Sequence, residues 1–521
     1  MFATSLDSLS KSTYIVDIQI VCLIQTNPVL MTYSSFVRKA VLLTVLFNTL
    51  VYMVMAQISP LDFGLREAQT GTDRYRALYA AHVAALANGL EVSYEGIDTL
   101  DIELPPDFQS IPVGKNTDFG GLVLYVTNNV RDGYLFTMYR TAQPLTLSKG
   151  LVDGLDFHGV PELADGDKLL ILNDQNPWTE RIGYGYRVYR QDILWVHNGQ
   201  AMNAPIAPWN TDSTCLNATY AEVDTSLKTF GGLTMHRTEV SQFKTCCFRL
   251  NGECNVLVHD IHVTTPKSKM IADGIFGVSN SVRVVFRDVT VEGTYSGYGR
   301  WRDYGYAFSL NNLWDTKFER VTADGNWGVF GTNNLSATEL SDCDINRFDI
   351  HCYGRDALLK RCTLHQRQTQ FSSMYGTVTF DSCHFIDCIP VRIRSSYNAY
   401  TPFDIVMKDC TFELTMRYHS LVNVMLLDTV VNSRPELNPK CWPNLTVTNM
   451  TVVVPAMVRS MNLYYPTGTL SELKKPVDYI NKVSVSGLKM IRPNGKPAKI
   501  PVRLSTKEFI PIQQLEVDIP L

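Results

Sequence analysis

The side chains best suited to chemistry lie in residues 347–353, where polar and apolar residues alternate. Successive side chains of an extended strand point to opposite faces, so Phe348, Ile350 and Cys352 are expected inside a core. The other four residues are expected to face outward together. They are Arg347, Asp349, His351 and Tyr353. A base, a carboxylate, a guanidinium and a phenol on one strand face form a candidate catalytic group.

More polar side chains join this face when the internal repeat of the sequence, described below, is used to align neighbouring segments. The alignment adds Tyr306, Asn326, Gln368 and Gln370 to the floor of a cleft, and it places Arg355 at the adjacent turn. The alternative interpretation is a solvated strand face whose charges have no function.

Two insertions are expected to rise beside the same face. The segment 266–274 supplies Lys267 and Lys269. The segment 292–306 supplies aromatic and cationic side chains, namely Tyr298, Arg300, Trp301, Arg302 and Tyr304. Aromatic rings offer flat apolar faces to sugars, and Arg binds carboxylate or sulfate in a bidentate manner, so we expect an acidic polysaccharide to bind here. The alternative is a loop in which Arg packs on its own Tyr residues.

Such a cleft is suited to β-elimination of a uronate-containing chain, in which a cation neutralises the carboxylate and a base removes the neighbouring proton. His351 is the natural base, since its ordinary pKa lies near neutral pH. Asp349 would orient the imidazole or help to hold a cation, and Arg347 and Arg355 would neutralise the carboxylate. The acid would be Tyr306 or Tyr353.

Hydrolysis is the competing reaction, and it needs two carboxyl groups on either side of the scissile bond. The expected cleft floor offers one good carboxyl candidate, Asp349, with Asp303 or Asp324 as weaker seconds. A protein that only binds glycans, such as a tailspike or an adhesin, is the non-enzymatic alternative.

A short apolar-polar segment recurs along the middle of the chain and predicts the fold. Its fourth position is occupied in turn by Ile261, Val289, Val321, Cys343, Cys362, Cys383 and Cys410. Steps of 19 to 32 residues with strand alternation and no intervening helix indicate an all-β fold, a parallel β-solenoid. The four cysteines are then expected to stack as buried free thiols. Asn280, Asn312 and Asn334 are expected at turns with left-handed backbone.

The amino-terminal part predicts three regions. Arg38 and Lys39 precede the apolar run Ala40–Met55, which predicts a signal peptide over 1–56, with 1–30 an over-extended start. The alternative is a membrane anchor, for which the run is short. Residues 57–100 should form a cap that contains an amphipathic helix over 74–88, ending at Gly89. Leu78, Ala81, Val83 and Leu86 form the helix's expected apolar side. Residues 101–521 should form the solenoid, with coil strands at 168–173 and 193–198 among long insertions and with loops that form the cleft.

Composition narrows the class of partner. The 521 residues carry 47 Lys+Arg and 51 Asp+Glu, a formal charge of −4, so nucleic acid is not an expected partner. The spacing of the 12 Cys residues shows no zinc motif. No cofactor is required by the sequence, although Ca²⁺ would be compatible with it. We expect an exported bacterial protein, periplasmic, secreted or on the cell surface, that is a monomer and has no stable membrane insertion.

Two segments carry a resemblance to a known family: IPVGKNTDFGGLVLYVTN (111–128) and NRFDIHCYGRD (346–356). Together with the repeat, they resemble right-handed, single-stranded parallel β-helix polysaccharide lyases of the pectate-lyase-like superfamily. Among these the sequence is similar to the gut-bacterial chondroitin, dermatan and hyaluronan lyases (polysaccharide lyase family twenty-nine). The resemblance implies cleavage of glycosaminoglycan by β-elimination, and it carries over no catalytic residue. The motif series of polygalacturonase-like hydrolases is matched only by Asn210–Asp212.

Overall fold

The computed structural model of the chain divides into two units, residues 1–58 and 59–521. In the first unit only strand β1 (Gln57–Ile58) is described. The structure describes residues 57–114, 116–128, 133–147, 151–181, 186–207, 209, 216–237, 245–264, 274–292, 306–323, 328–350, 352–366, 368–394, 403–425, 430–431, 441–467, 479–504 and 512–518. The predicted signal peptide therefore lies outside the described residues. No helix in the described ranges is long and apolar enough to cross a membrane.

The second unit begins with the predicted cap. A short 3-10 helix, η2 (Pro60–Phe63), precedes α3 (Gly71–Asn88). Thr70 and Asp73 form a capping box at the start of α3, and Gly89 ends the helix with a left-handed φ of 63°. Leu78 and Ala81 are fully buried, as predicted. Val83 and Leu86 are 39% and 51% exposed, so that part of the prediction is wrong.

The buried side of α3 differs from the predicted one, since Ala77 and Ala85 are buried beside Leu78 and Ala81. It includes Tyr75 and His82, which pack over the first strands of the solenoid. Tyr75 Oη donates to the carbonyl of Gln109 at 2.6 Å, and the ring nitrogens of His82 lie 3.1 Å from Pro112 O and 2.8 Å from Tyr94 Oη. The helix thus covers the open end of the β-helix core, which is the function expected of a cap.

His82 makes the stability of this cap dependent on pH. Burial lowers the pKa of His82 to about 4 in the folded protein, whereas an unfolded His titrates near 6.5. The unfolded state therefore binds the proton more readily, and stability falls as the pH drops from about 6.5 to about 4, by roughly 3 kcal/mol in total. Chemical denaturation across this pH range should show the loss, and a His82→Gln variant should lack that component. An unchanged pH profile in the variant would contradict this.

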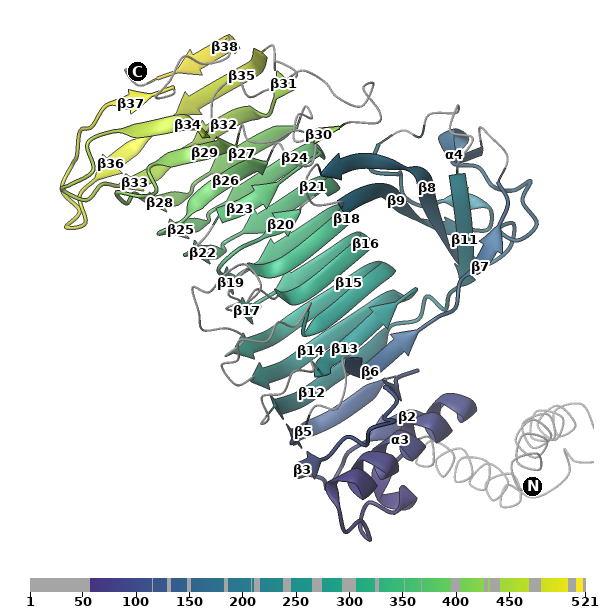
Figure 1. The fold of residues 1–521 in the computed structure, drawn as a ribbon. Coiled ribbons are helices and arrows are strands. Elements are labelled where there is room, and N and C mark those ends of the chain that lie inside the picture. The colour runs from purple at the N-terminus through teal and green to yellow at the C-terminus, as the bar shows by residue number, and fades with distance from the viewer. Residues whose placement is uncertain are drawn as a thin grey trace, which may run out of the picture. The chain divides into compact units, whose positions relative to one another are not determined.

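Parallel strands of the second unit stack as successive rungs (Figure 1). In the largest sheet the strands after the cap are β2 (Glu91–Ser93), β3 (Thr99–Ile102), β4 (Ile111–Pro112), β5 (Thr117–Val126), β6 (Gly133–Tyr139), β12 (Lys228–Arg237), β13 (Thr245–Asn251), β14 (Cys254–Thr264), β15 (Phe276–Glu292), β16 (Tyr306–Glu319), β17 (Thr322–Ala323), β18 (Gly328–Ser341) and β19 (Asp344–Ile345). It continues through β21 (Cys352–Lys360), β22 (Thr363–His365), β24 (Met374–Asp381), β25 (His384–Ile386), β27 (Asp404–Lys408), β28 (Thr411–Glu413), β31 (Cys441–Trp442), β32 (Asn444–Thr448), β33 (Thr451–Val453), β35 (Tyr479–Ser486), β36 (Lys489–Ile491) and β38 (Ile512–Val517).

A second parallel sheet forms another face of the later rungs. Its strands are β20 (Asp349–Ile350), β23 (Gln368–Phe371), β26 (Ile389–Arg394), β29 (Ser420–Met425), β34 (Met461–Thr467) and β37 (Val502–Arg503). The in-register parallel pairing confirms the predicted all-β fold, a parallel β-helix with an amino-terminal capping helix.

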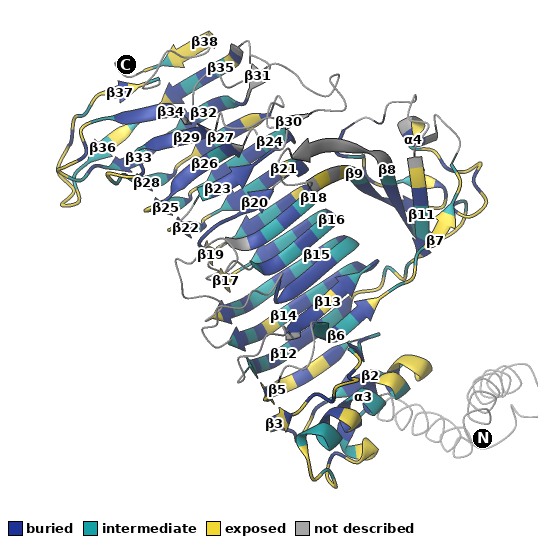
Figure 2. Ribbon diagram, viewed as in Figure 1, coloured by how far each residue is buried: buried dark blue, intermediate teal, exposed yellow. Residues whose placement is uncertain are grey.

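Buried residues recur on successive rungs of the solenoid (Figure 2), and the interior is built from apolar side chains. Phe276, Phe308 and Phe330 stack along one column with ring centroids 5.1 Å apart at each step. All seven residues at the repeat's fourth position are at most 2% exposed, which confirms the predicted repeat. The three predicted turn asparagines have left-handed backbone, with φ of 48°, 58° and 54° for Asn280, Asn312 and Asn334.

The cysteine column is also as predicted. Cys343, Cys362, Cys383 and Cys410 are buried free thiols, and each Sγ lies 3.2–3.5 Å from a backbone carbonyl of the preceding coil. Cys246, Cys247 and Cys254 are buried and free as well. Burial raises the pKa of Cys254 to about 11, so its thiol stays protonated at neutral pH.

An antiparallel sheet, here called the inserted sheet, interrupts the solenoid between β6 and β12 (Figure 1). Its strands are β7 (Gln143–Leu145), β8 (Asp167–Arg181), β9 (Tyr186–His197), β10 (Gln200–Ala201) and β11 (Leu216–Glu222), with the helix α4 (Leu151–Gly154) and a distant strand, β30 (Val430–Val431). It has its own core, around Phe157, Leu172 and Leu194. The predicted coil strands at 168–173 and 193–198 belong to β8 and β9 and pair antiparallel, so this part of the prediction is wrong.

Candidate functional site

Arg347 and Asp349 are buried and do not lie on an exposed strand face. Phe348 and Ile350 are in the core, as predicted. Arg347 and Asp349 are 1% and 0% exposed and form an ion pair at 2.5 Å. The expectation of an accessible acid and guanidinium is therefore wrong. Strand alternation predicts the side to which a residue points, whereas burial depends on which other parts of the chain cover that side. Two opposite charges that form an ion pair can be buried together.

Tyr353 is also removed from the expected cleft. Its backbone is left-handed, with φ of 69°, so strand alternation does not extend past Cys352. The ring packs against Ile206 and Ala207, which lie between β10 and β11 of the inserted sheet, and its hydroxyl donates to Asp192 Oδ2 at 3.0 Å. Burial raises the pKa of Tyr353 well above its ordinary value, so a role as a catalytic acid is not supported.

Tyr353 is one part of a buried network that fastens the inserted sheet to the solenoid. Asp192 accepts hydrogen bonds from Trp209 Nε1 at 2.8 Å and from Arg190 Nε at 3.2 Å. The guanidinium of Arg190 also lies over the rings of Trp209 and Tyr353. Arg355, predicted to neutralise a substrate carboxylate, donates instead to the carbonyl of Ile206 at 3.0 Å, although it stays partly exposed.

Two of the remaining described candidates, Gln368 and Gln370, lie on β23, the strand that pairs with β20. Asp349 and Gln370 are register partners on β20 and β23, and Gln368 lies on the same strand as Gln370. Gln370 is 1% exposed, so it is not available at a cleft floor. Tyr306 is half-buried, and its ring lies so close over Gly331 that a Cβ there would come 2.6 Å from it. Tyr306 is therefore partly accessible, and its position on a cleft floor stays a prediction.

The other predicted site residues lie outside the described residues. They are Lys267, Lys269, Tyr298, Arg300, Trp301, Arg302, Tyr304, Asn326 and His351. Their roles remain predictions. In the described ranges, no group of three or more His, Cys, Asp or Glu side chains could hold a metal ion.

A pocket that the sequence did not suggest lies where the inserted sheet meets the solenoid. Its volume is about 340 Å³. The solenoid supplies its floor and the inserted sheet its opposite wall, and the connecting segment 140–142 completes it. The polar lining residues are Tyr139, Arg140, Thr141, Asn173, Gln191, Thr219, Arg249, Asn251, Asn280 and Asn311. Because these residues come from distant parts of the sequence, their meeting could not be read from any motif.

The amides of the floor are held in a fixed arrangement. Asn251 Oδ1 accepts from Asn280 Nδ2 at 3.1 Å, and Asn280 Oδ1 accepts from Asn312 Nδ2 at 2.9 Å. Asn311 Nδ2 donates to Gln191 Oε1 on β9 at 3.0 Å. Side chains that are positioned in advance lose little entropy when a ligand binds, so this floor suits a polar ligand.

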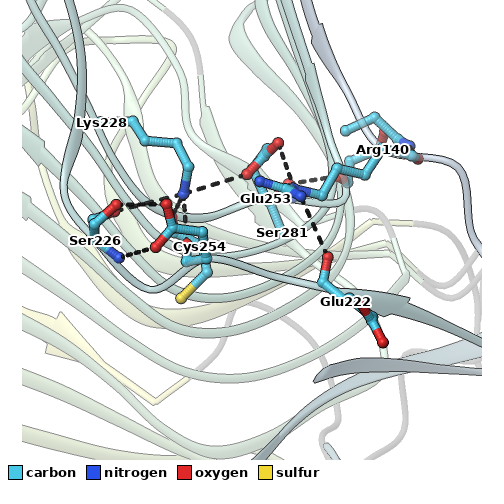
Figure 3. A network of polar contacts seen from close by, with 10 residues as sticks. Arg140, Glu222, Ser226, Lys228, Glu253, Cys254 and Ser281 are labelled. Carbon is cyan, nitrogen blue, oxygen red and sulfur yellow. Dashed lines mark hydrogen bonds and ion pairs between the residues drawn. The ribbon is translucent and has the colours of Figure 1, made fainter. Parts of the chain in front are cut away.

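Cationic side chains outnumber carboxylates around the pocket within the described residues. Glu253 is 3% exposed and lies between two cations, with Arg140 Nε at 2.8 Å from Oε1 and Lys228 Nζ at 3.4 Å from Oε2 (Figure 3). One carboxylate is thus shared by two cations. Arg249 is exposed, lies 6.0 Å from the ring of Tyr134 and forms no ion pair within the described residues. The described lining of the pocket contains no carboxylate.

This arrangement can bind an anionic group that carries polar substituents. Guanidinium groups bind carboxylate and sulfate through parallel hydrogen bonds, and amides can donate to and accept from hydroxyl groups. The described lining lacks the pair of carboxyl groups that glycoside hydrolysis requires. Tyr139, which is 57% exposed, contributes a phenol at the rim.

Comparison with known proteins supports the fold. No family model and no curated protein matches the sequence. Among solved structures, the chain is similar to the tailspike protein gp49 from Pseudomonas phage LKA1, at 12% identity over 83% of this chain and 84% of that chain, with a TM-score of 0.53. The tailspike gp61 from Pseudomonas phage phi297 gives 12% identity, coverages of 86% and 83%, and a TM-score of 0.46. The A-module of the Azotobacter vinelandii mannuronan C-5 epimerase AlgE4 is 9% identical over 89% of this chain and 97% of that chain, with a TM-score of 0.28. At these identities the likeness to gp49 extends to the fold, and we conclude that the chain is a parallel β-helix protein of the architecture seen in that tailspike.

Proposed function

We propose that this protein binds an acidic polysaccharide and that the pocket between the inserted sheet and the solenoid is its binding site. The observation that carries the proposal is the lining of that pocket: two arginines and a row of ordered amides, with no carboxylate among the described lining residues. A ligand that brings a carboxylate or sulfate together with hydroxyl groups matches this lining in charge and in hydrogen bonding.

The physical features of the site agree with such a ligand. Its volume of about 340 Å³ is near the lower end for small-molecule sites. Arg249 is exposed and can exchange water for a carboxylate without breaking an ion pair within the described residues. Polysaccharides of this class lie outside the cytoplasm, which agrees with the export signal predicted from the apolar run Ala40–Met55.

Cleavage by β-elimination is the second candidate function, with a glycosaminoglycan such as chondroitin sulfate, dermatan sulfate or hyaluronan as the substrate. This reaction needs a cation beside the substrate carboxylate and a group that accepts a proton. Arg140 and Arg249 would supply the first, and Tyr139, as the phenolate, would accept the C5 proton and return it to the departing glycosidic oxygen, since all three line the pocket. Hydrolysis is disfavoured, because the described lining offers no carboxyl pair.

A panel of polysaccharides tests both functions at once. The protein should be retained by at least one uronate polymer among hyaluronan, chondroitin sulfate, alginate and polygalacturonate, and by none of the neutral polymers dextran and amylose. A rise in ultraviolet absorbance from unsaturated uronate ends would establish elimination, and its loss in Tyr139→Phe with binding retained would assign the phenol. Equal retention on neutral and acidic polymers would overturn the proposal.

A further inference from the structure

We infer that the pocket receives the end of an acidic polysaccharide, or a single-residue branch, rather than an internal stretch of the chain. This inference rests on the proposed function and adds to it the part of the polymer that is recognised. It follows from the contacts that close the pocket at both of its ends along the solenoid axis.

The floor of the pocket crosses four rungs of the solenoid. Tyr139 pairs with Asn251, Asn251 with Ser279, and Ser279 with Asn311, each on the next rung along the axis. Rungs lie about 4.8 Å apart, so the backbones of Tyr139 and Asn311 are separated by roughly 14 Å. A polymer that ran through the pocket along the solenoid axis would have to leave it beyond both of these positions.

The first end is closed by the segment that leads from the solenoid to the inserted sheet. Arg140 N donates to the carbonyl of Asn251 at 3.0 Å, which ties this segment to the neighbouring rung. The side chain of Arg140 then reaches Glu253 of the solenoid at 2.8 Å and the carbonyl of Glu222 of the inserted sheet at 3.4 Å (Figure 3). Arg140 therefore joins the two walls across this end.

Close packing of the backbone strengthens the same closure. Gly252 follows Asn251 and has a left-handed φ of 74°, and a Cβ at this position would lie 3.4 Å from Arg140 Cβ. Buried Lys228 holds the far side of Glu253 and also donates to the carbonyls of Asp224 and Cys254. Main-chain and charged contacts therefore hold the described residues together across this end.

The second end is closed by β9. Gln191 Oε1 accepts from Asn311 Nδ2 at 3.0 Å, and so joins the inserted sheet to the floor. Beyond this bond the two walls are in direct contact, because Ile206 and Ala207 pack on Tyr353, and Tyr353 donates to the buried Asp192. Among the described residues, the way into the pocket that remains is from the side between the walls.

The closed pocket also sets the chemistry of the terminal sugar. Two guanidinium groups, from Arg140 and Arg249, lie at the end nearer Tyr139, whereas the amides of Asn280 and Asn311 lie toward the other end. A sugar with a carboxylate on one side of the ring and hydroxyl groups on the other fits this division. The expected ligand is a terminal uronate or another terminal sugar acid.

Fragments of polygalacturonate test the inference, because every residue of this polymer is the same uronate. Binding of fragments of increasing length is measured by isothermal titration calorimetry, with D-galacturonate as the shortest probe and D-galactose as its neutral counterpart. Ligand concentration is expressed as the total concentration of galacturonate residues. If only chain ends bind, the residue concentration needed for half-saturation rises in proportion to chain length. D-galacturonate should then compete with the longest fragment. Hyaluronan and alginate fragments with D-glucuronate and D-mannuronate serve in the same way.

A variant tests whether this end is closed by the wall contact rather than by Gln191 alone. Gln191→Ala removes the bond to Asn311 but leaves Ile206 and Ala207 packed on Tyr353, so the dependence on chain ends should persist, while circular dichroism stays unchanged. Half-saturation per residue that is independent of length in the native protein, or binding that requires several internal residues, would overturn end recognition but leave polysaccharide binding intact. Absence of binding to every uronate polymer would overturn the proposed function itself.

Discussion

Replacing Arg249 with alanine is expected to weaken the binding of acidic polysaccharide by roughly 10- to 100-fold, which corresponds to the loss of a hydrogen-bonded charge pair. Arg249 lines the pocket, is exposed and forms no ion pair within the described residues. Its guanidinium is therefore available to the ligand, and its removal leaves no buried charge behind. Titration calorimetry with the uronate polymer selected from the panel measures the effect.

Arg361→Ala is the matched control for this variant. Arg361 is an exposed arginine on another face of the solenoid, paired with Asp342 at 2.6 Å, and an exposed pair contributes about 1 kcal/mol or less to stability. Both variants should keep the circular dichroism and the unfolding midpoint of the native protein, and only Arg249→Ala should lose affinity. Similar losses in both variants would indicate a general effect of charge, and no loss in either would remove Arg249 from the site.

Replacing Asp349 with alanine is expected to lower the free energy of unfolding by about 3–5 kcal/mol, because it leaves the guanidinium of Arg347 buried without its carboxylate. Both side chains of this pair are fully buried. The result would separate a structural role from the catalytic role predicted for Asp349 from the sequence. Urea unfolding followed by circular dichroism gives the free energy.

A double variant distinguishes the two roles. Arg347→Met combined with Asp349→Leu removes both charges, and it should recover most of the stability lost in Asp349→Ala, since well-packed apolar residues can replace a buried ion pair. It should also keep polysaccharide binding. If Asp349→Ala folds with native stability and loses only turnover, Asp349 acts in catalysis and the structural account of this pair is wrong.

The fold was predictable because the same short pattern recurs many times along the chain. Each copy places an apolar residue such as Val289 or Cys362 in the same interior column, and errors at one copy are corrected by the others. The inserted sheet was not predictable in this way. Residues 168–173 and 193–198 have the same composition as coil strands, and only their pairing partners show that they run antiparallel. Strand alternation carries no information about partners.

The candidate site was predictable only in part, for a related reason. The pattern correctly placed Phe348 and Ile350 in the core. It could not show that Arg347 and Asp349 would be buried as a pair, or that the inserted sheet would cover Tyr353. Arg249 could not be recognised as a site residue from the sequence. It is an isolated arginine, and it lines a pocket only because the inserted sheet, a distant segment, lies opposite it.

The most direct test of the account is the location of a bound uronate oligosaccharide in a crystal structure of the protein. The account predicts density in the pocket, with the carboxylate of the terminal sugar on Arg249 and its hydroxyl groups on the amides of Asn280 and Asn311. An oligosaccharide seated on the outward face around Tyr306, with the pocket empty, would contradict it.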